Sequence, residues 1–314
     1  MPPRLSIVSL LLPTALGLHG LRKKSLSTSG ALTAFLVGFM MISGAEGLGL
    51  KVWGVALIGF YLLGSRATKY GKERKRKLEA GFQDYGNRSG WQVLSNSFSA
   101  VLACSAWNVL FVPQGVHAWI FDALPLNLKD IPTRTYTSDW CPLDKDVGAG
   151  WSRVLLFAAL GHFACCLGDT LASELGILSS SPPRLITTGK VVPHGTNGGV
   201  SVGGTLASLI GGLTIGAMMS ICLVLENAGC RSAWFTTFRD FVLWGGLGGF
   251  GGSFLDSLLG ATIQITRYDD ERKLIVEEVE DKKLKVINGL NILTNNQVNV
   301  VSSVCTAIVI ALLA

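Results

Sequence analysis

The sequence predicts an all-α polytopic membrane protein of about eight transmembrane helices, with one small cytosolic β-hairpin. Of the 314 residues, 49% are hydrophobic and 15% are charged, whereas a soluble domain carries roughly 25% charged residues. Glycine, present 38 times, is frequent in the apolar segments, where small residues let helices approach closely. These observations favour a single helical domain embedded in a bilayer.

Apolar runs divide the chain into spans separated by polar loops. The first run contains Pro13 and is followed, not preceded, by Arg22, Lys23 and Lys24. A cleaved signal peptide has the opposite arrangement, so we expect a transmembrane helix there. The expected spans are residues 5–20, 31–47, 50–64, 93–113, 151–168, 200–225, 241–263 and 298–314.

Basic residues are concentrated beside the membrane. Residues 65–92 contain eight Lys or Arg and three acids, which argues for an orientation signal and against a nucleic-acid surface, because Lys and Arg mark the cytoplasmic side. Both termini are therefore expected on the non-cytoplasmic side, and Asn87, in an Asn-X-Ser pattern, is expected to stay unglycosylated. The membrane itself is expected to be an endomembrane of the ER type. The predicted cytosolic loops are residues 21–30, 65–92, 169–199 and 264–297.

Two local patterns complete the fold prediction. The seven cysteines fall mostly inside apolar segments without metal-like spacing, so we expect small buried apolar side chains rather than a disulfide framework. Residues 273–287 alternate between apolar and polar side chains well enough to predict the small β-hairpin.

The residues that suggest chemistry begin where the fifth span ends. If that helix continues past the membrane boundary, Asp169 and Ser173 share one stripe and Glu174 lies on the next. A carboxylate with a nearby hydroxyl and a second carboxylate suits Mg²⁺ that is shared with substrate phosphates; the alternative is a helix end whose acids are solvated. Asp256, inside the seventh span, is expected to face a cation or a second metal ion.

A glycine-rich turn precedes the sixth span. Backbone N–H groups at the start of a helix favour an anion, and successive glycines let them approach phosphate oxygens; the alternative is an ordinary tight turn of a membrane loop. Lys190 adds a charge before this turn, and Arg66 and Lys69 form a second basic pair that could hold a phosphate. We expect Asp169, Lys190 and the turn to converge on one cytosolic cavity. The turn residues are Gly195, Thr196, Asn197, Gly198 and Gly199.

Taken together, these motifs closely resemble the transmembrane protein 19 family, nearly from end to end. The likeness rests on Gly168-Asp169-Thr170 with Ala172-Ser173-Glu174, on residues 183–188, on residues 195–200 after Val192-Pro193, and on Asp256-Ser257 with residues 259–262. The plant branch of that family is similar to phytyl-phosphate kinase. More distantly, the GD-x-x-AS helix followed by a lysine and a glycine turn is similar to dolichol kinase and to CTP-dependent cytidylyltransferases.

The resemblance implies a membrane-embedded, prenyl-phosphate kinase-like phosphotransferase that converts an isoprenoid monophosphate to a diphosphate, with CTP as the favoured donor. It implies that Asp169, Ser173 and Glu174 bind Mg²⁺ and that Lys190 and the glycine turn bind nucleotide phosphates. Asn197 departs from the plant branch, which tends to carry an acidic residue there. Three alternatives stay open: a CDP-lipid-forming cytidylyltransferase-like enzyme, a transporter with Asp256 on its substrate path, and a non-catalytic membrane scaffold.

Overall fold

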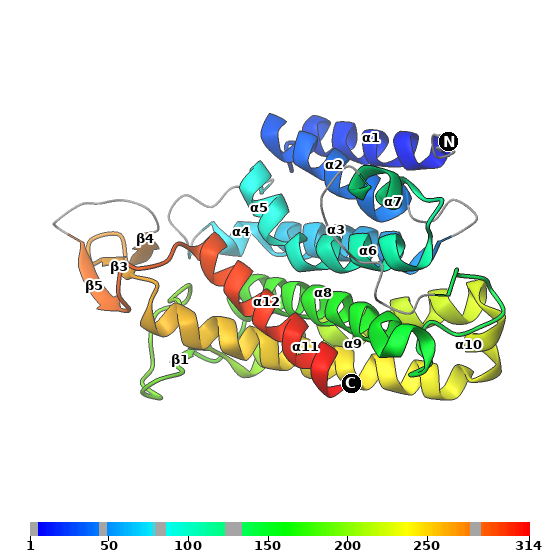
Figure 1. Cartoon of the computed structure of the whole chain (residues 1–314). Helices are drawn as coiled ribbons and strands as arrows, with labels where there is room; N and C mark the ends of the chain where they lie inside the picture. The colour runs from blue at the N-terminus through cyan, green and yellow to red at the C-terminus, as the bar shows by residue number, and fades with distance from the viewer. Residues whose placement is uncertain (1–5, 44–48, 77, 79–85, 123–133, 277–283) are drawn as a thin grey trace.

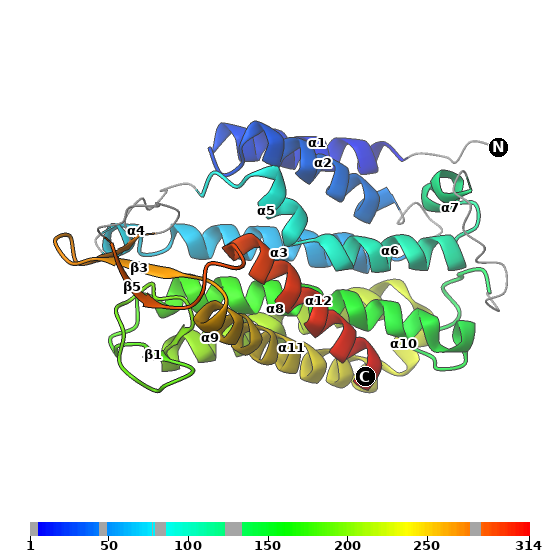
Figure 2. The same cartoon turned by 60° about the vertical axis from the view of Figure 1, so that its left-hand side comes forward.

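The computed structural model describes residues 6–43, 49–76, 78, 86–122, 134–276 and 284–314. Its long helices run side by side, with a small sheet and the strand β1 (Arg184–Leu185) at one end and α7 and α10 at the other (Figures 1 and 2). The longer helices are α1 (Ile7–Arg22), α2 (Thr28–Ser43), α3 (Val52–Lys69), α6 (Phe98–Phe111), α8 (Trp151–Gly176), α9 (Val202–Glu226), α11 (Trp234–Thr262) and α12 (Asn295–Leu313). The shorter ones are α4 (Lys72–Lys75), α5 (Gly90–Ser95), α7 (Val116–Phe121), η1 (Val147–Gly150) and α10 (Ala228–Ser232).

The mostly helical architecture is confirmed, while the number of membrane spans stays a prediction. Three described stretches are long and apolar enough to cross a membrane: Val147–Gly176, Val202–Glu226 and Asn295–Leu313. Three more apolar helices, α1, α2 and α6, are shorter than the roughly 20 residues that a straight crossing requires. Each of the eight expected spans overlaps a described helix, but α3 and α11 are not among these six apolar helices.

The expected fourth span is two helices rather than one. α5 ends at Ser95 and α6 begins at Phe98. The Ser95 hydroxyl donates to Trp91 O and the Ser97 hydroxyl donates to Val93 O, each at 2.8 Å. Hydroxyls that bond back to the preceding turn compete with the helix and bend it, and the break places Asn96 at a corner between the two helices.

The centre of the bundle is formed by α8, α9 and α11, which meet through glycines. A Cβ atom built on Gly212 of α9 would lie 2.1 Å from Gly245 O of α11, and one on Gly168 of α8 would lie 2.7 Å from Gly249 O. No side chain fits between backbones this close. The close helix approach expected from the glycines of the apolar segments is thus present, and it fixes α8 and α11 against each other.

Large aromatic side chains fill the core beside α3 and α6. The rings of Trp53 and Trp107 lie 6.0 Å apart, and Trp107 also packs against Phe111 and Tyr136 at 5.2 and 5.4 Å between ring centroids. These residues belong to one buried hydrophobic cluster that continues into α8 and α9. The N-terminal helices α3 and α6 are thereby anchored to the glycine-packed centre.

Cys141 and Cys230 form a disulfide, which corrects the expectation that the cysteines stay unpaired. The bond joins the segment before α8 to α10, where Asn227 Nδ2 donates to Trp140 O at 2.8 Å. Its partners are 89 residues apart, and spacing alone carries no pairing signal for cysteines scattered through an apolar chain. Among the remaining cysteines, Cys104, Cys165 and Cys166 are buried as expected.

The small sheet has three strands, so the expected hairpin over residues 273–287 is wrong in its pairing. The antiparallel order is β4-β3-β5, with β3 (Thr266–Asp269) between β4 (Leu274–Val276) and β5 (Lys285–Asn288). Asp269 Oδ1 accepts from the backbone N–H of Glu271 and Arg272, which forms the β3–β4 turn. Alternation identified the later strands but not their partner, and part of the expected hairpin, residues 277–283, lies outside the described residues.

Candidate functional site

A cavity of about 670 Å³ lies at the end of the bundle that carries the sheet. Its walls come from α8, α9, α11, the start of α12, the glycine turn before α9 and the segment around Arg88 that precedes α5. Polar side chains far apart in the sequence therefore face one another across a single space.

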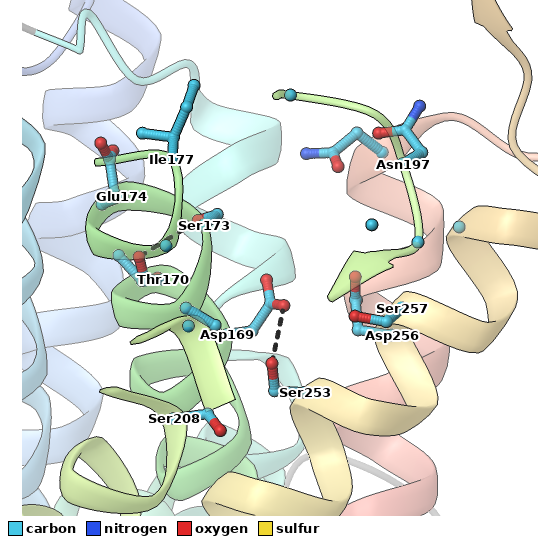
Figure 3. Close-up of a pocket in the computed structure, with 18 of the residues that line it drawn as sticks. Asp169, Thr170, Ser173, Glu174, Ile177, Asn197, Ser208, Ser253, Asp256 and Ser257 are labelled. Atoms are coloured by element: carbon cyan, nitrogen blue, oxygen red, sulfur yellow. Dashed lines mark hydrogen bonds between the residues drawn. The ribbon is translucent and has the colours of Figure 1, made fainter. Parts of the chain in front are cut away.

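Asp169 of α8 and Asp256 of α11 both face this cavity (Figure 3). The Ser253 hydroxyl donates to Asp169 Oδ1 at 3.4 Å, and the Ser302 hydroxyl donates to Asp256 Oδ2 at 2.8 Å. With its amide oriented to satisfy its neighbours, Asn299 Nδ2 also donates to Asp256 Oδ2 at 3.2 Å. Within the described residues neither carboxylate has an ion-pair partner, so both keep lone pairs directed at the cavity.

Ser173 and Glu174 line the same cavity but have partners of their own. The Ser173 hydroxyl donates to Thr170 O at 3.1 Å. Glu174 points away from Asp169 (Figure 3) and forms an ion pair with Lys75 of α4. The Lys75 side chain is only 1% exposed, and its ammonium group also donates to Ala67 O at 2.9 Å. Lys75 therefore lies inside the protein, although it belongs to the basic segment that the sequence identified as an orientation signal, and it holds the end of α3 against α8.

The two aspartates fit a divalent ion by the nature of their donor atoms. Across the described residues, no group of three His, Cys, Asp or Glu side chains is placed to hold a metal. Mg²⁺ requires only one or two carboxylates, because water and substrate phosphates complete its coordination. Asp169 and Asp256 supply that number, and the Ser173 and Ser253 hydroxyls lie in the same wall.

All five residues of the glycine turn line the cavity. Gly195 and Gly198 have φ angles of +84° and +76°, which L side chains rarely adopt. A Cβ atom on Gly198 would lie 2.6 Å from Ser257 O of α11, so the turn is seated directly on that helix. Asn288 Nδ2 of β5 donates to Asn197 O at 2.9 Å and ties the turn to the sheet.

The turn does not open the sixth helix as the sequence suggested. It leads into β2 (Gly199–Val200), which pairs with β1 (Arg184–Leu185), and α9 begins only at Val202. The Ser201 hydroxyl accepts from Gly204 N at 3.1 Å and caps the N-terminus of α9. An anion at the turn would therefore meet the backbone of a short ribbon rather than the start of a helix.

The basic residues that line the cavity are not the ones the sequence singled out. Lys190 is exposed in the turn after β1, Arg66 and Lys69 are exposed on α3, and none of the three lines the cavity. Arg88 does line it. The expected convergence therefore holds for Asp169 and the glycine turn and leaves Lys190 outside.

Arg88 is positioned from both its main chain and its side chain. Its backbone N–H donates to Ser25 O and its carbonyl accepts from Ser27 N, each at 3.0 Å, while its guanidinium donates to Ser65 Oγ at 3.2 Å and Thr68 Oγ1 at 3.3 Å. Burial lowers the pKa of Arg88, and the nearby Glu174 carboxylate acts in the opposite direction. A half-buried cation with spare N–H donors is suited to bind an anion.

One feature of the sequence distinguishes Arg88 from the other basic residues of its loop. It stands apart from the Lys72–Lys77 run and is followed by Ser89, which begins the capping box of α5 together with Gln92. The capping box fixes the backbone that immediately follows Arg88.

The fold and the cavity define a class: a polytopic helical membrane protein with a carboxylate- and glycine-lined polar site at one end of its bundle. The chain belongs to the family described as integral membrane protein DUF92, whose model matches residues 11–307. This membership confirms the family resemblance drawn from the motifs.

Three relatives show how far the similarity extends. Protein PGR of Arabidopsis thaliana is 34% identical over 305 residues, which cover 96% of this chain and 93% of that protein. An uncharacterized membrane protein of Methanocaldococcus jannaschii is 27% identical over 82% of each chain. Protein VTE6, chloroplastic, of Arabidopsis thaliana is 24% identical over 59% of this chain and 44% of that protein. No solved structure matches.

Proposed function

We propose that this protein is a Mg²⁺-dependent phosphotransferase of the prenyl-phosphate kinase type, which transfers a phosphoryl group from a nucleoside triphosphate, CTP by preference, to an isoprenoid monophosphate. The observation that carries the proposal is the pair Asp169 and Asp256, which face one cavity from two helices opposite a glycine turn. Phosphoryl transfer depends on positioning and charge neutralisation more than on covalent chemistry by the protein. The motif resemblance to phytyl-phosphate kinase supports the same reaction class.

Each wall has a role in this reaction. Asp169 and Asp256 would hold the ion, which would supply positive charge to neutralise the donor phosphates, and the backbone of residues 195–199 would bind the donor. Arg88 holds the acceptor monophosphate. The bond between the terminal phosphorus and the nucleoside diphosphate oxygen breaks, and a bond from that phosphorus to an oxygen of the acceptor monophosphate forms, so the products are a prenyl diphosphate and a nucleoside diphosphate.

A label-transfer experiment tests the proposal against its nearest rival. Purified protein with Mg²⁺ and a panel of prenyl monophosphates is given CTP labelled at either the γ or the α phosphorus. We expect the γ label, and not the α label, in the lipid product. Transfer of the α label with release of pyrophosphate would instead identify a CDP-lipid-forming enzyme, and no transfer from any nucleoside triphosphate would reject both activities.

The proposed orientation places the cavity on the cytosolic side of an endomembrane, where the nucleotide is available, and both termini on the other side. The Cys141–Cys230 disulfide supports this, because it lies at the end of the bundle opposite the cavity and disulfides persist in oxidising compartments.

Cysteine accessibility in sealed ER-derived vesicles tests the orientation. The exposed Cys305 is first replaced in the variant Cys305→Ser. On this background, Ser180→Cys in the cavity-side loop should react with a membrane-impermeant maleimide, whereas Ser232→Cys beside the disulfide should react only after permeabilisation. Both positions are exposed. The reverse pattern, or a glycan on Asn87, would invert the topology.

A further inference from the structure

A second cavity, almost entirely apolar, adjoins the polar one. It has a volume of about 80 Å³ and lies among α1, α2, α3 and α5. Its lining includes Pro13, Ala34, Val37, Leu57 and Phe60. Of these four helices, α1 and α2 contribute no residue to the lining of the polar cavity.

The two cavities share Arg88, Gln92 and Asn96. Asn96 is at the break between α5 and α6, and Gln92 is held by the N-terminal cap of α5, where its Oε1 accepts from Ser89 N at 2.9 Å. Two of the five guanidinium N–H donors of Arg88 are used by α3 hydroxyls, which leaves others for a ligand. Polar side chains, including the cation of Arg88, thus lie where the apolar cavity adjoins the polar one.

We propose that this apolar cavity binds the head-proximal part of the hydrocarbon chain of a lipid monophosphate, whose phosphate lies against Arg88 at the junction. The inference rests on the proposed function and separates its two substrates: the lipid acceptor occupies the side of α1–α3, and the donor occupies the side of the glycine turn. The three lining residues that the two cavities share, and the positive charge of Arg88 among them, favour an amphipathic anion.

The size of the cavity limits what it can recognise. One water-sized probe needs roughly 10–15 Å³, so about 80 Å³ accommodates a short segment of chain and not a whole prenyl tail. The rest of the tail then lies in the bilayer. Selectivity should therefore depend on the first one or two isoprene units, and chain length beyond them should change the KM for the acceptor less than about threefold.

Filling the cavity tests this assignment. Ala34→Phe projects a ring into it from α2, and we expect the KM for a prenyl monophosphate to rise at least tenfold while the KM for the nucleotide stays constant. Leu36→Phe is the matched control, because the same ring is added on the same helix at a side chain that is 53% exposed. Leu57→Trp fills the cavity from α3 if Ala34→Phe does not fold. Unchanged acceptor KM in a folded filled variant would overturn the inference.

A photolabelling experiment gives a readout that needs no phosphoryl transfer. The probe is a prenyl monophosphate with a diazirine in its first isoprene unit. Labelling within residues 34–42 or 57–61 that disappears in Ala34→Phe supports the tail site, even if the wild-type protein transfers no phosphate and the proposed function fails. Labelling confined to outward-facing residues such as Leu62, and unaffected by Ala34→Phe, overturns the tail site even if transfer is observed.

Discussion

The two walls of the polar cavity are built in different ways. On one side, Asp169 and Asp256 stand on helices that touch backbone to backbone through glycines. On the other side, Arg88 belongs to a segment between helices and is held by hydrogen bonds to hydroxyls of α3. Main-chain packing fixes the first wall, and polar side chains position the second.

This difference matches two different demands on a phosphotransferase. A metal and the phosphates it binds need ligands held within a fraction of an ångström, which close-packed helices provide. A lipid acceptor must enter from the bilayer, so its wall adjoins the apolar cavity, where side chains rather than backbones form the boundary. In the proposed reaction, the glycine-packed wall would therefore carry catalysis and the other wall would bind the acceptor.

Removing one charge from the carboxylate wall should have the largest effect. Asp169→Asn and Asp256→Asn are each expected to lower kcat for label transfer at least about 100-fold, or about 2.7 kcal/mol, because neither variant can neutralise the ion as the wild type does. Asp270→Asn, at an exposed turn of the sheet, is the control and should keep the wild-type rate. Full activity of Asp256→Asn would show that the reaction needs the Asp169 carboxylate but not that of Asp256.

Changes on the other wall should act on acceptor binding instead. Arg88→Gln is expected to raise the KM for the prenyl monophosphate about tenfold or more, since a charge-assisted hydrogen bond contributes about 1.5–3 kcal/mol. Arg66→Gln and Lys190→Gln, both exposed and outside the cavity lining, serve as controls with nearly unchanged KM. A larger rise in KM with Lys190→Gln than with Arg88→Gln would support the role that the family motif implies for Lys190. It would contradict the proposal that Arg88 binds the acceptor phosphate.

The carboxylate wall could be anticipated from the sequence because its signals are local. Asp169 interrupts an apolar helix, Asp256 does the same in another, and the run Gly245–Gly252 indicates a close crossing. Each of these is visible within about one helical length. The structure then brings both aspartates to one cavity with the glycine turn.

The wall that carries Arg88 could not be predicted from the sequence, because its side chains are positioned by contacts between segments far apart in the chain. Eight Lys or Arg fall within residues 65–92, and charge alone does not say that Arg88 turns to α3 while Lys75 is buried against Glu174. The same holds for the disulfide and for the strand order β4-β3-β5. In each case the partner is set by packing between distant segments, which no local pattern encodes.

Substitutions at two glycines of α11 test how much the backbone contact between helices contributes to the stability of the carboxylate wall. A Cβ atom on Gly249 would lie 2.6 Å from Ser208 O, whereas one on Gly251 meets nothing within 4 Å. Gly249→Ala should therefore lower the free energy of unfolding by about 1–3 kcal/mol, and Gly251→Ala should leave it unchanged or raise it by up to about 1 kcal/mol. Thermal unfolding in detergent measures both, and equal midpoints would mean that the close crossing is not a stability determinant.

The smallest expected effect tests whether Glu174 is structural or catalytic. Lys75→Met leaves Glu174 unpaired and should lower the free energy of unfolding by about 1–2 kcal/mol, less than for a fully buried pair, because the Glu174 side chain is 23% exposed and water can solvate it. Arg74→Met, exposed on the same short helix, should change stability by less than about 0.5 kcal/mol.

The double variant Lys75→Met/Glu174→Gln then separates the two roles of Glu174, because it removes both charges of the pair at once. If Glu174 only pairs with Lys75, the double variant regains stability over Lys75→Met and keeps its transfer activity, and the metal stays assigned to Asp169 and Asp256 alone. If Glu174 is the metal ligand that the sequence predicts, stability returns but transfer stays lost. The carboxylate wall would then extend one turn further along α8, toward the residues that hold Arg88.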